Sequence, residues 1–171
     1  MRCSRSIILA AEYDVKIAFA TYDSPQDCGG VSTWMQRTLP LLQAAGVEVE
    51  VHIMAFEGRP GVNCAFYKKQ RIPFRWTTWQ QHLPYGVRSF CKFLEESQPD
   101  VYVPNCILPA YYTAGYARRS GIITVGVLHS DDPFHWGLVD EFINGSPDFR
   151  LSAIVPVSSF LESQVRSMVA E

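Results

Sequence analysis

Residues 15–46 read VKIAFATYDSPQDCGGVSTWMQRTLPLLQAAG and carry the clearest strand, turn and helix signals in the chain. Val15–Thr21 is rich in β-branched and aromatic residues, which is typical of a strand. Beyond Gly30, apolar residues recur at helical spacing and predict one buried stripe, formed by Val31, Trp34, Met35, Thr38 and Leu42. Gly46 is the expected stop of this helix, and Pro40 inside it lacks a backbone donor, which predicts a kink.

Further along the chain, short apolar runs alternate with longer amphipathic stretches, which is typical of a parallel sheet covered by helices. The other strands are expected at Val47–Met54, Asp100–Pro104, Ile122–Leu128 and Ala153–Val157, with a weaker one near Cys64–Tyr67. The other helices are expected around Val87–Leu94 and over Ile107–Ser120 and Ser158–Ala170, with Gly121 as a stop and Ser158 or Ser159 as an N-cap. The sequence therefore predicts an α/β fold: a single Rossmann-like, doubly wound, mostly parallel sheet with helices on both faces. Ligands bind to such sheets beyond the carboxyl ends of the strands.

The composition fits one folded domain over residues 1–171, because the chain is 47% hydrophobic and 19% charged and has no low-complexity tract. Fifteen Lys and Arg against seventeen Asp and Glu give a net charge of −2, which argues against a surface built to bind nucleic acid.

The five cysteines are widely spaced without a Cys-x-x-Cys pair, which is typical of free thiols in a reducing compartment. The apolar run Ile7–Ala11 is too short for a signal peptide or a membrane span, so we expect a cytoplasmic location.

Two glycines, Gly29 and Gly30, stand between the first expected strand and the first expected helix. Glycines at a helix N-terminus let backbone N–H groups approach an anion closely, and the helix dipole favours a diphosphate there. The dinucleotide fingerprint Gly-x-Gly-x-x-Gly is not met, because Thr33 stands where the last glycine falls. The chain has no Gly-Lys dipeptide, which excludes a Walker A loop. The alternative for the two glycines is a tight turn without a ligand.

Residues 129–136, HSDDPFHW, follow the expected strand Ile122–Leu128 and bring two histidines and two aspartates to the ligand-binding edge. In one interpretation His129, Asp131, Asp132 and His135 bind zinc, manganese or iron, since imidazole and carboxylate ligands suit these metals. In a second, His129 donates a hydrogen bond to a bound sugar or phosphate while the aspartates cap the next helix. A third is an acidic surface loop with a buried histidine.

Residues 58–94 contain seven basic residues and no Asp or Glu, and aromatic residues are interleaved with them. Cations mixed with aromatic rings suit an anionic membrane surface, a phosphorylated acceptor or an acidic partner. We expect such contacts from Lys68, Lys69, Arg71 and Arg75. The alternative is a plain solvated face, which is common for runs of charge.

The order of these features resembles the N-terminal half of the family 4 glycosyltransferases, which are retaining enzymes of the GT-B fold. The resemblance runs from Val15 to Glu171 and rests on the Gly29–Gly30 turn before a helix with Trp34, PDVYV at 99–103, a strand ending in His129, and AIVPVSSF at 153–160. GT-B enzymes pair two Rossmann-like domains, with the acceptor mostly on the first and the nucleotide-sugar mostly on the second. The chain departs from the family at Pro104-Asn105-Cys106, where members often carry a histidine.

The resemblance implies roles for particular residues. The N–H groups of Gly29 and Gly30 face the donor diphosphate, and His129 is the catalytic residue beside the transferred sugar carbon. The acceptor or cleft side is expected to hold Asn105, Asp131 and Ser158. The nucleotide-sugar is a substrate, the acceptor is a glycan or lipid, and neither a cofactor nor an obligatory metal is expected.

The donor-binding domain of that family carries a Glu-x7-Glu motif, and none of the nine glutamates here has another eight positions on. We therefore expect residues 1–171 to be the acceptor-side domain alone, without the C-terminal donor-binding domain, and to be inactive by itself. Peripheral contact with a membrane is expected from the basic segment. Two other classes stay open: a metal-dependent hydrolase that uses the cluster at 129–135, and a non-enzymatic α/β module that binds an anion.

Overall fold

The computed structural model describes residues 15–26 and 29–169. Within these residues the strands are β1 (Lys16–Asp23), β2 (Glu48–Ala55), β3 (Phe74–Thr78), β4 (Val101–Pro104), β5 (Ile123–Leu128) and β6 (Ala153–Pro156). The helices are α1 (Gly30–Ala44), α2 (Val62–Gln70), α3 (Leu83–Ser97), α4 (Leu108–Tyr112), α5 (Ala114–Arg119), α6 (Pro133–Val139) and α7 (Ser159–Met168). Two short helical turns lie at Phe56–Gly58 and Asp140–Asn144.

The described strands form one parallel sheet in the order β3-β2-β1-β4-β5-β6. This confirms the predicted Rossmann-like, doubly wound fold class, and the five principal strands lie within two residues of their predicted bounds. The chain builds outward from β1 to one side through β2 and β3, and then returns to β4 on the other side. The carboxyl ends of β1 and β4 consequently flank the point where the strand order reverses, which is where open α/β sheets bind ligands.

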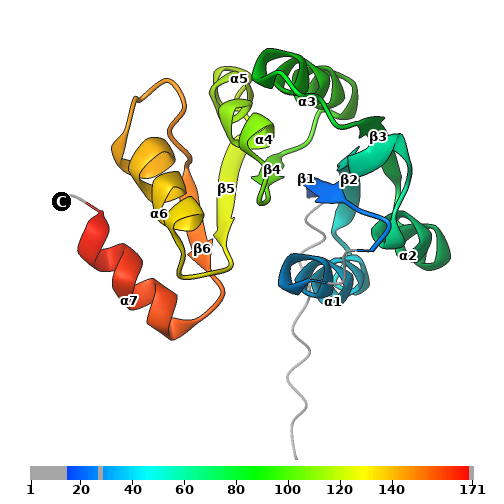
Figure 1. Ribbon diagram of the computed structural model, residues 1–171, viewed down its shortest axis with the longest axis horizontal. Helices are drawn as coiled ribbons and strands as arrows, with labels where there is room; N and C mark the ends of the chain where they lie inside the picture. Colours follow the sequence, from blue (N-terminus) through cyan, green and yellow to red (C-terminus); the bar gives the residue numbers. More distant parts are fainter. Residues whose placement is uncertain (1–14, 27–28, 170–171) are drawn as a thin grey trace, which may run out of the picture.

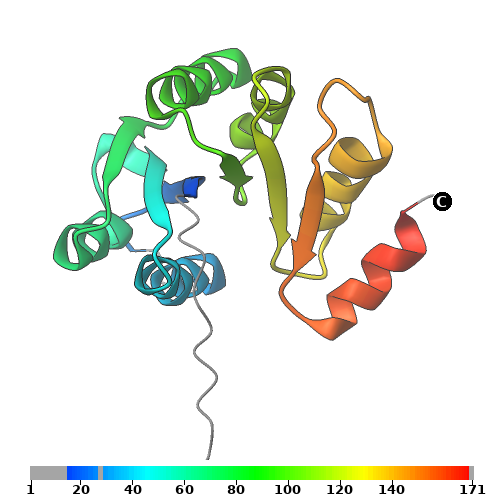
Figure 2. The same cartoon turned by 180° about the vertical axis from the view of Figure 1, so that it is seen from behind.

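Helices cover both faces of the sheet, with α1 and α2 on one face and α3, α4 and α5 on the other (Figure 1). Alternate residues of β1 point to opposite faces and show this division. Phe19 packs with Met35 and Leu39 of α1, whereas Ala20 packs with Phe90 of α3. The helices α6 and α7 lie at the end of the sheet beside β6 (Figure 2). Among the described helices, none is both long and apolar enough to cross a bilayer.

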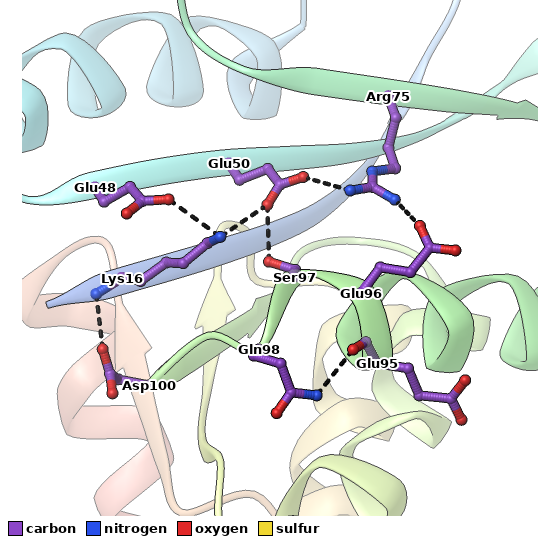
Figure 3. A network of polar contacts seen from close by, with 9 residues as sticks. All are labelled: Lys16, Glu48, Glu50, Arg75, Glu95, Glu96, Ser97, Gln98 and Asp100. Carbon is purple, nitrogen blue, oxygen red and sulfur yellow. Dashed lines mark hydrogen bonds and ion pairs between the residues drawn. The ribbon is translucent and has the colours of Figure 1, made fainter.

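Charged residues tie the strands together at their amino ends (Figure 3). The Nζ of Lys16 lies 3.1 Å from Oε1 of Glu48 and 3.4 Å from Oε2 of Glu50. Glu50 also binds Arg75, at 2.9 Å, and Arg75 forms a second ion pair with Glu96 of α3. The guanidinium of Arg75 is therefore neutralised by two carboxylates at the edge of the sheet opposite to the carboxyl ends.

The prediction of a weak strand near Cys64–Tyr67 is wrong, because these residues lie in helix α2. The N-terminal amides of α2 are held by a residue distant in sequence: Asp23, at the end of β1, accepts hydrogen bonds from the N–H groups of Gly61, Asn63 and Cys64. The strand in this region is β3, which follows Pro73. Its sequence, FRWTT, has the aromatic and β-branched composition that could have identified it.

The single helix predicted over Ile107–Ser120 is divided at Thr113 into α4 and α5. The hydroxyl of Thr113 donates a hydrogen bond to the carbonyl oxygen of Pro109 at 2.8 Å, which competes with the regular helical pattern. The predicted stops are confirmed, since Gly46 and Gly121 follow their helices with φ of +86° and +77°. Helix α1 runs through Pro40.

Candidate functional site

The carboxyl ends of neighbouring parallel strands bring together residues that are far apart in sequence. The turn to α1 follows β1, Asn105 follows β4, and His129 follows β5. His129 Nε2 lies 2.7 Å from Oδ1 of Asn105, and the backbone N–H of Asn105 donates to the carbonyl oxygen of Ala20 in β1. The structure thus brings Asn105 and His129 together, as their predicted places at the strand ends require.

The ring of His129 is fixed from two sides. The indole of Trp34, on α1, meets it edge-on with ring centroids 5.1 Å apart. The Oδ1 of Asn105 accepts from Nε2–H, so a neutral ring presents Nδ1 as an acceptor. Burial, with a smaller contribution from His135, lowers the pKa of His129 to about 4. The imidazole is therefore neutral at pH 7, and Trp34 ties it to the helix that begins at the two glycines.

The N-terminus of α1 is open to solvent. Gly29 is the N-cap residue, with φ −66° and ψ 179°, and Gly30 is the first helical residue; both are exposed. A Cβ added at Gly30 would meet nothing within 4 Å. Among the described residues, no side chain stands in the way of an anion at Gly30, and the helix dipole favours its charge.

The acidic residues after β5 hold the start of α6. Asp132 is the N-cap, and its Oδ1 accepts from the backbone N–H of His135 at 3.0 Å and lies 2.9 Å from Nδ1 of the same residue. These two hydrogen bonds lower the pKa of Asp132 to about 2. Asp131 accepts instead from Nε1 of Trp136. The predicted capping is therefore confirmed for Asp132, and Asp131 has a different partner.

The interpretation of His129, Asp131, Asp132 and His135 as metal ligands does not fit the arrangement of these side chains. Within residues 15–26 and 29–169, no group of three or more His, Cys, Asp or Glu side chains is placed to hold a metal ion. Asp131 and Asp132 face separate partners, as described above, and His129 faces Asn105.

Sequence reasoning missed Cys106, which lies between β4 and α4 next to the site. Its Sγ is 3.5 Å from Nε2 of His135, and its backbone has φ +54°. Burial raises the pKa of the thiol to about 12. The sequence signal for this position was its place directly after a strand at the carboxyl edge, one residue beyond Asn105.

An apolar groove runs past Cys106. It consists of two adjoining cavities, of about 450 and 260 Å³, that share Trp79, Cys106 and Phe134 in their walls. The rings of Phe56 and Trp79 stack in it with centroids 4.2 Å apart. We call this the aromatic groove; its other lining residues are Tyr22, Val31, Gln80, Gln81, Leu83, Ile107, Leu108, Pro109 and His135. None of these lining residues is Lys, Arg, Asp or Glu.

Other predicted site residues lie apart from Asn105, His129 and the aromatic groove. Ser158 follows β6, and its hydroxyl accepts from the N–H of Leu161 as the N-cap of α7. Lys68 and Lys69 end helix α2, and Arg71 follows them, all exposed. Since α2 begins beside the carboxyl end of β1 and leads back to the start of β3, these cations lie toward the opposite edge of the sheet. A larger cavity, of about 670 Å³, lies between β6 and α7 and contains none of the predicted site residues.

We expect acid to destabilise the chain through buried histidines. His52 is 2% exposed and lies against Phe90 and Phe93, and burial, with a smaller contribution from Arg75, lowers its pKa to about 4. An unfolded histidine titrates near 6.5. Between these values the unfolded chain binds more protons, so stability is complete above about pH 6.5 and falls as the pH drops toward 4. At about 1.4 kcal/mol per pKa unit, His52 accounts for a loss of about 3 kcal/mol at pH 4.

Urea unfolding at a series of pH values measures this effect, with His52→Gln as the matched variant. The variant should lose less stability on acidification than the natural chain, although His129, whose pKa is also lowered to about 4, still contributes. Identical pH dependence in the two proteins would contradict the role assigned to His52.

The fold is that of one half of a GT-B protein, and solved structures of two kinds share it: glycosyltransferases and UDP-N-acetylglucosamine 2-epimerases. The glycosyltransferase from Rickettsia africae ESF-5 has a TM-score of 0.62 at 11% identity, over 91% of this chain and 41% of that one. MurG from Acinetobacter baumannii has a TM-score of 0.54 at 16% sequence identity, and the match covers 80% of this chain and 44% of MurG. The UDP-GlcNAc 2-epimerase from Methanocaldococcus jannaschii has a TM-score of 0.58 at 12% sequence identity, and the match covers 90% of this chain and 42% of the epimerase.

These similarities are similarities of fold, and the chain spans less than half the length of each of the three proteins. No model of a protein family matches the sequence. No curated protein matches it by sequence either.

Proposed function

We propose that this chain is the acceptor-side N-terminal domain of a retaining glycosyltransferase, which transfers a sugar from a nucleotide-sugar to an acceptor. The observation that carries the proposal is the pairing of the exposed start of helix α1 at Gly30 with a neutral imidazole, His129, linked to the same helix by Trp34. A fold shared with glycosyltransferases supports it.

The chemistry of glycosyl transfer explains why these groups suit one another. The leaving nucleoside diphosphate gains negative charge as the bond to the sugar breaks, and backbone N–H groups at a helix N-terminus stabilise that charge. The sugar develops positive charge, so a neutral ring with a free acceptor atom is better placed beside it than an imidazolium. His129 has this character, because burial lowers its pKa. We expect no obligatory metal in this reaction.

The aromatic groove supports one class of acceptor. Within the part of the chain that the structure describes, its walls are mainly rings and aliphatic side chains, without a Lys, Arg, Asp or Glu. A phosphorylated or acidic acceptor finds no counter-charge there, whereas an apolar and uncharged body is held by contact with the rings. The acceptor we propose is therefore a hydroxyl on an apolar, uncharged molecule. Contact with an anionic membrane is proposed for the exposed Lys68, Lys69 and Arg71, and a donor-binding domain for the other side of the cleft.

Nucleotide binding can be tested on the chain directly. In a ¹⁵N-labelled sample, UDP, GDP and ADP are added separately, and the amide signals of Gly29 and Gly30 are followed. At least one of the three should shift these signals and those of Trp34 and His129 at millimolar concentration. If none of the three shifts them, the helix N-terminus is not a diphosphate site and the proposal fails.

Transfer itself requires the protein in its natural context. The comparison uses extracts of two kinds of cells: cells whose own gene for this protein is intact, and cells in which codon 129 of that gene encodes alanine. His129→Ala should lower transfer from labelled nucleotide-sugars by about 100-fold, with the chain present in equal amount, and the natural product should keep the anomeric configuration of the donor. Nucleotide binding without any transfer would instead favour a non-enzymatic anion-binding module.

A further inference from the structure

Cys106, His135 and Asp132 are joined in series beside the aromatic groove, and Cys106 and His135 line it. The Sγ of Cys106 lies 3.5 Å from Nε2 of His135, and Nδ1 of His135 lies 2.9 Å from Oδ1 of Asp132. His135 is only 6% exposed, while Cys106 is half-buried and borders both cavities of the groove. Thiol, imidazole and carboxylate thus stand in the order that nucleophilic catalysis uses.

The carboxylate determines which nitrogen of His135 carries the proton. Asp132 is ionised and can only accept, because hydrogen bonds from His135 lower its pKa to about 2. Nδ1 must therefore carry the proton that is donated to Asp132, and a neutral ring then has an unprotonated Nε2. That nitrogen faces Cys106 and can accept its S–H proton. Since burial raises the pKa of the thiol, Cys106 rests as a neutral thiol that a base must deprotonate.

The backbone at Cys106 is in an uncommon conformation that points to the same role. Its φ of +54° lies in the left-handed region, which costs a residue with a side chain free energy and is concentrated at functional sites. Cys106 stands in the turn from strand β4 to helix α4. A nucleophile on a strained strand-to-helix turn is presented at the top of the sheet in the same way in α/β hydrolases.

We propose that Cys106 is an acyl-accepting nucleophile, with His135 as its general base and Asp132 as the residue that orients the base. When Sγ attacks the carbonyl carbon of an ester, the S–C bond forms, the C–O bond to the alcohol breaks, and the S–H proton passes through Nε2 to the departing alkoxide. Water then attacks the thioester carbon and gives a proton to Nε2, which returns it to Sγ as the acid leaves. No oxidant or reductant takes part.

The groove sets the class of ester. The side chains beside Cys106 in both cavities are Trp79 and Phe134, and among the described residues no Lys, Arg, Asp or Glu lines either cavity. An apolar, uncharged acyl group is held there by burial of its surface, whereas a charged one loses solvation without a compensating partner. The substrate class is therefore an activated ester of an apolar acid.

The test uses p-nitrophenyl butyrate and the chain itself. A burst of p-nitrophenolate is expected, together with a butyryl adduct that mass spectrometry places on Cys106. Cys106→Ala should abolish both, and His135→Gln should slow the burst by about 100-fold. Cys91→Ala is the matched control, because Cys91 is also a half-buried free thiol, and it should leave the burst unchanged. Butyryl groups on Cys91 or on lysines, with a rate unaffected by Cys106→Ala, would overturn the proposal.

Asp132→Asn separates orientation of the base from a purely structural role. Asparagine is as good an N-cap as aspartate, so α6 and the unfolding transition should be preserved. The amide can accept from or donate to Nδ1, so the productive tautomer is no longer enforced, and acylation should slow by on the order of 100-fold or more. A variant that folds normally and acylates at the natural rate would remove Asp132 from the series and contradict the proposed mechanism.

Discussion

Gly30→Pro is expected to lower sugar transfer by about 100-fold or more while leaving the fold intact. Proline differs from glycine at this point in lacking the backbone N–H. Under the proposed function, that N–H is one of the donors that meet the charge on the departing nucleoside diphosphate. Loss of a single donor of this kind typically costs two to three orders of magnitude in rate, about 100–1000-fold.

The local backbone is suited to the substitution. Gly30 is the first residue of α1, where proline is favoured because the N–H of that position has no acceptor within the helix. Gly29 has ψ 179°, the extended conformation that a residue before proline adopts. A side chain at Gly30 meets open space. The free energy of unfolding should therefore stay the same or rise by about 0.5 kcal/mol, since proline restricts the unfolded chain.

Gly30→Ala is the matched control, since alanine adds a Cβ but keeps the N–H. Transfer is measured in extracts of cells whose own gene carries each change, and stability by urea unfolding of the chain. Alanine should retain far more transfer than proline, although its methyl group narrows the approach of the phosphate. Equal transfer by the proline variant and the natural protein would remove the backbone amide of Gly30 from the mechanism.

Most of the fold could be predicted from sequence because the principal strands are short apolar runs, and several of the helices between them have amphipathic spacing. The glycines at 46 and 121 are local signals, and both follow their helices with positive φ. Of the stripe predicted after Gly30, Met35 is buried and Trp34 and Leu42 are partly buried against the core, whereas the other buried residues of α1 are Ser32 and Leu39. A parallel sheet also fixes where strand ends meet. Asn105 and His129 could therefore be placed at one edge without any knowledge of their contact.

The errors fall where a distant residue determines the local structure. Cys64–Tyr67 is a short continuous apolar run, which a buried strand and a helix can share, and the helix there is held by Asp23, some forty residues earlier in the chain. Arg75 was grouped with exposed cations because its neighbours in sequence are basic. Its partners, Glu50 and Glu96, come from another strand and a helix.

Cys106 was missed for a similar reason. The sequence placed His135 in a cluster with its neighbours Asp131 and His129, where a metal was one interpretation. In the structure the ring of His135 turns from that cluster to a thiol 29 positions earlier in the chain, and only the pairing of β4 with β5 brings the two together. A nucleophile, its base and its orienting group are recognised by geometry and not by order in the sequence.

Asp23→Ala should lower the free energy of unfolding by at least about 3 kcal/mol, a large part of the 5–15 kcal/mol typical of a domain. The side chain of Asp23 is completely buried. Its carboxyl oxygens accept from the N–H groups of Gly61 at 2.8 Å, Asn63 at 3.2 Å and Cys64 at 3.1 Å. Alanine leaves these donors without an acceptor, and each unsatisfied buried donor costs about 1–3 kcal/mol.

The packing at Gly61 shows why the structure cannot relax around this loss. A Cβ at Gly61 would lie 2.2 Å from the carbonyl oxygen of Ser24, so the start of α2 is pressed against the end of β1. Because Tyr22 and Phe56 of the aromatic groove flank this junction in the sequence, the groove should lose its shape as well.

Urea unfolding measures the effect, with Asp100→Ala as the matched control. Asp100 also accepts from one backbone N–H, that of Lys16 at 2.8 Å, but it is exposed, so its loss should cost less than about 1 kcal/mol. Asp23→Asn, which keeps one accepting oxygen, should fall between the natural chain and Asp23→Ala and provides a measurable value if the alanine variant does not fold. Similar small costs for Asp23→Ala and Asp100→Ala would show that the junction of β1 and α2 does not depend on this carboxyl group.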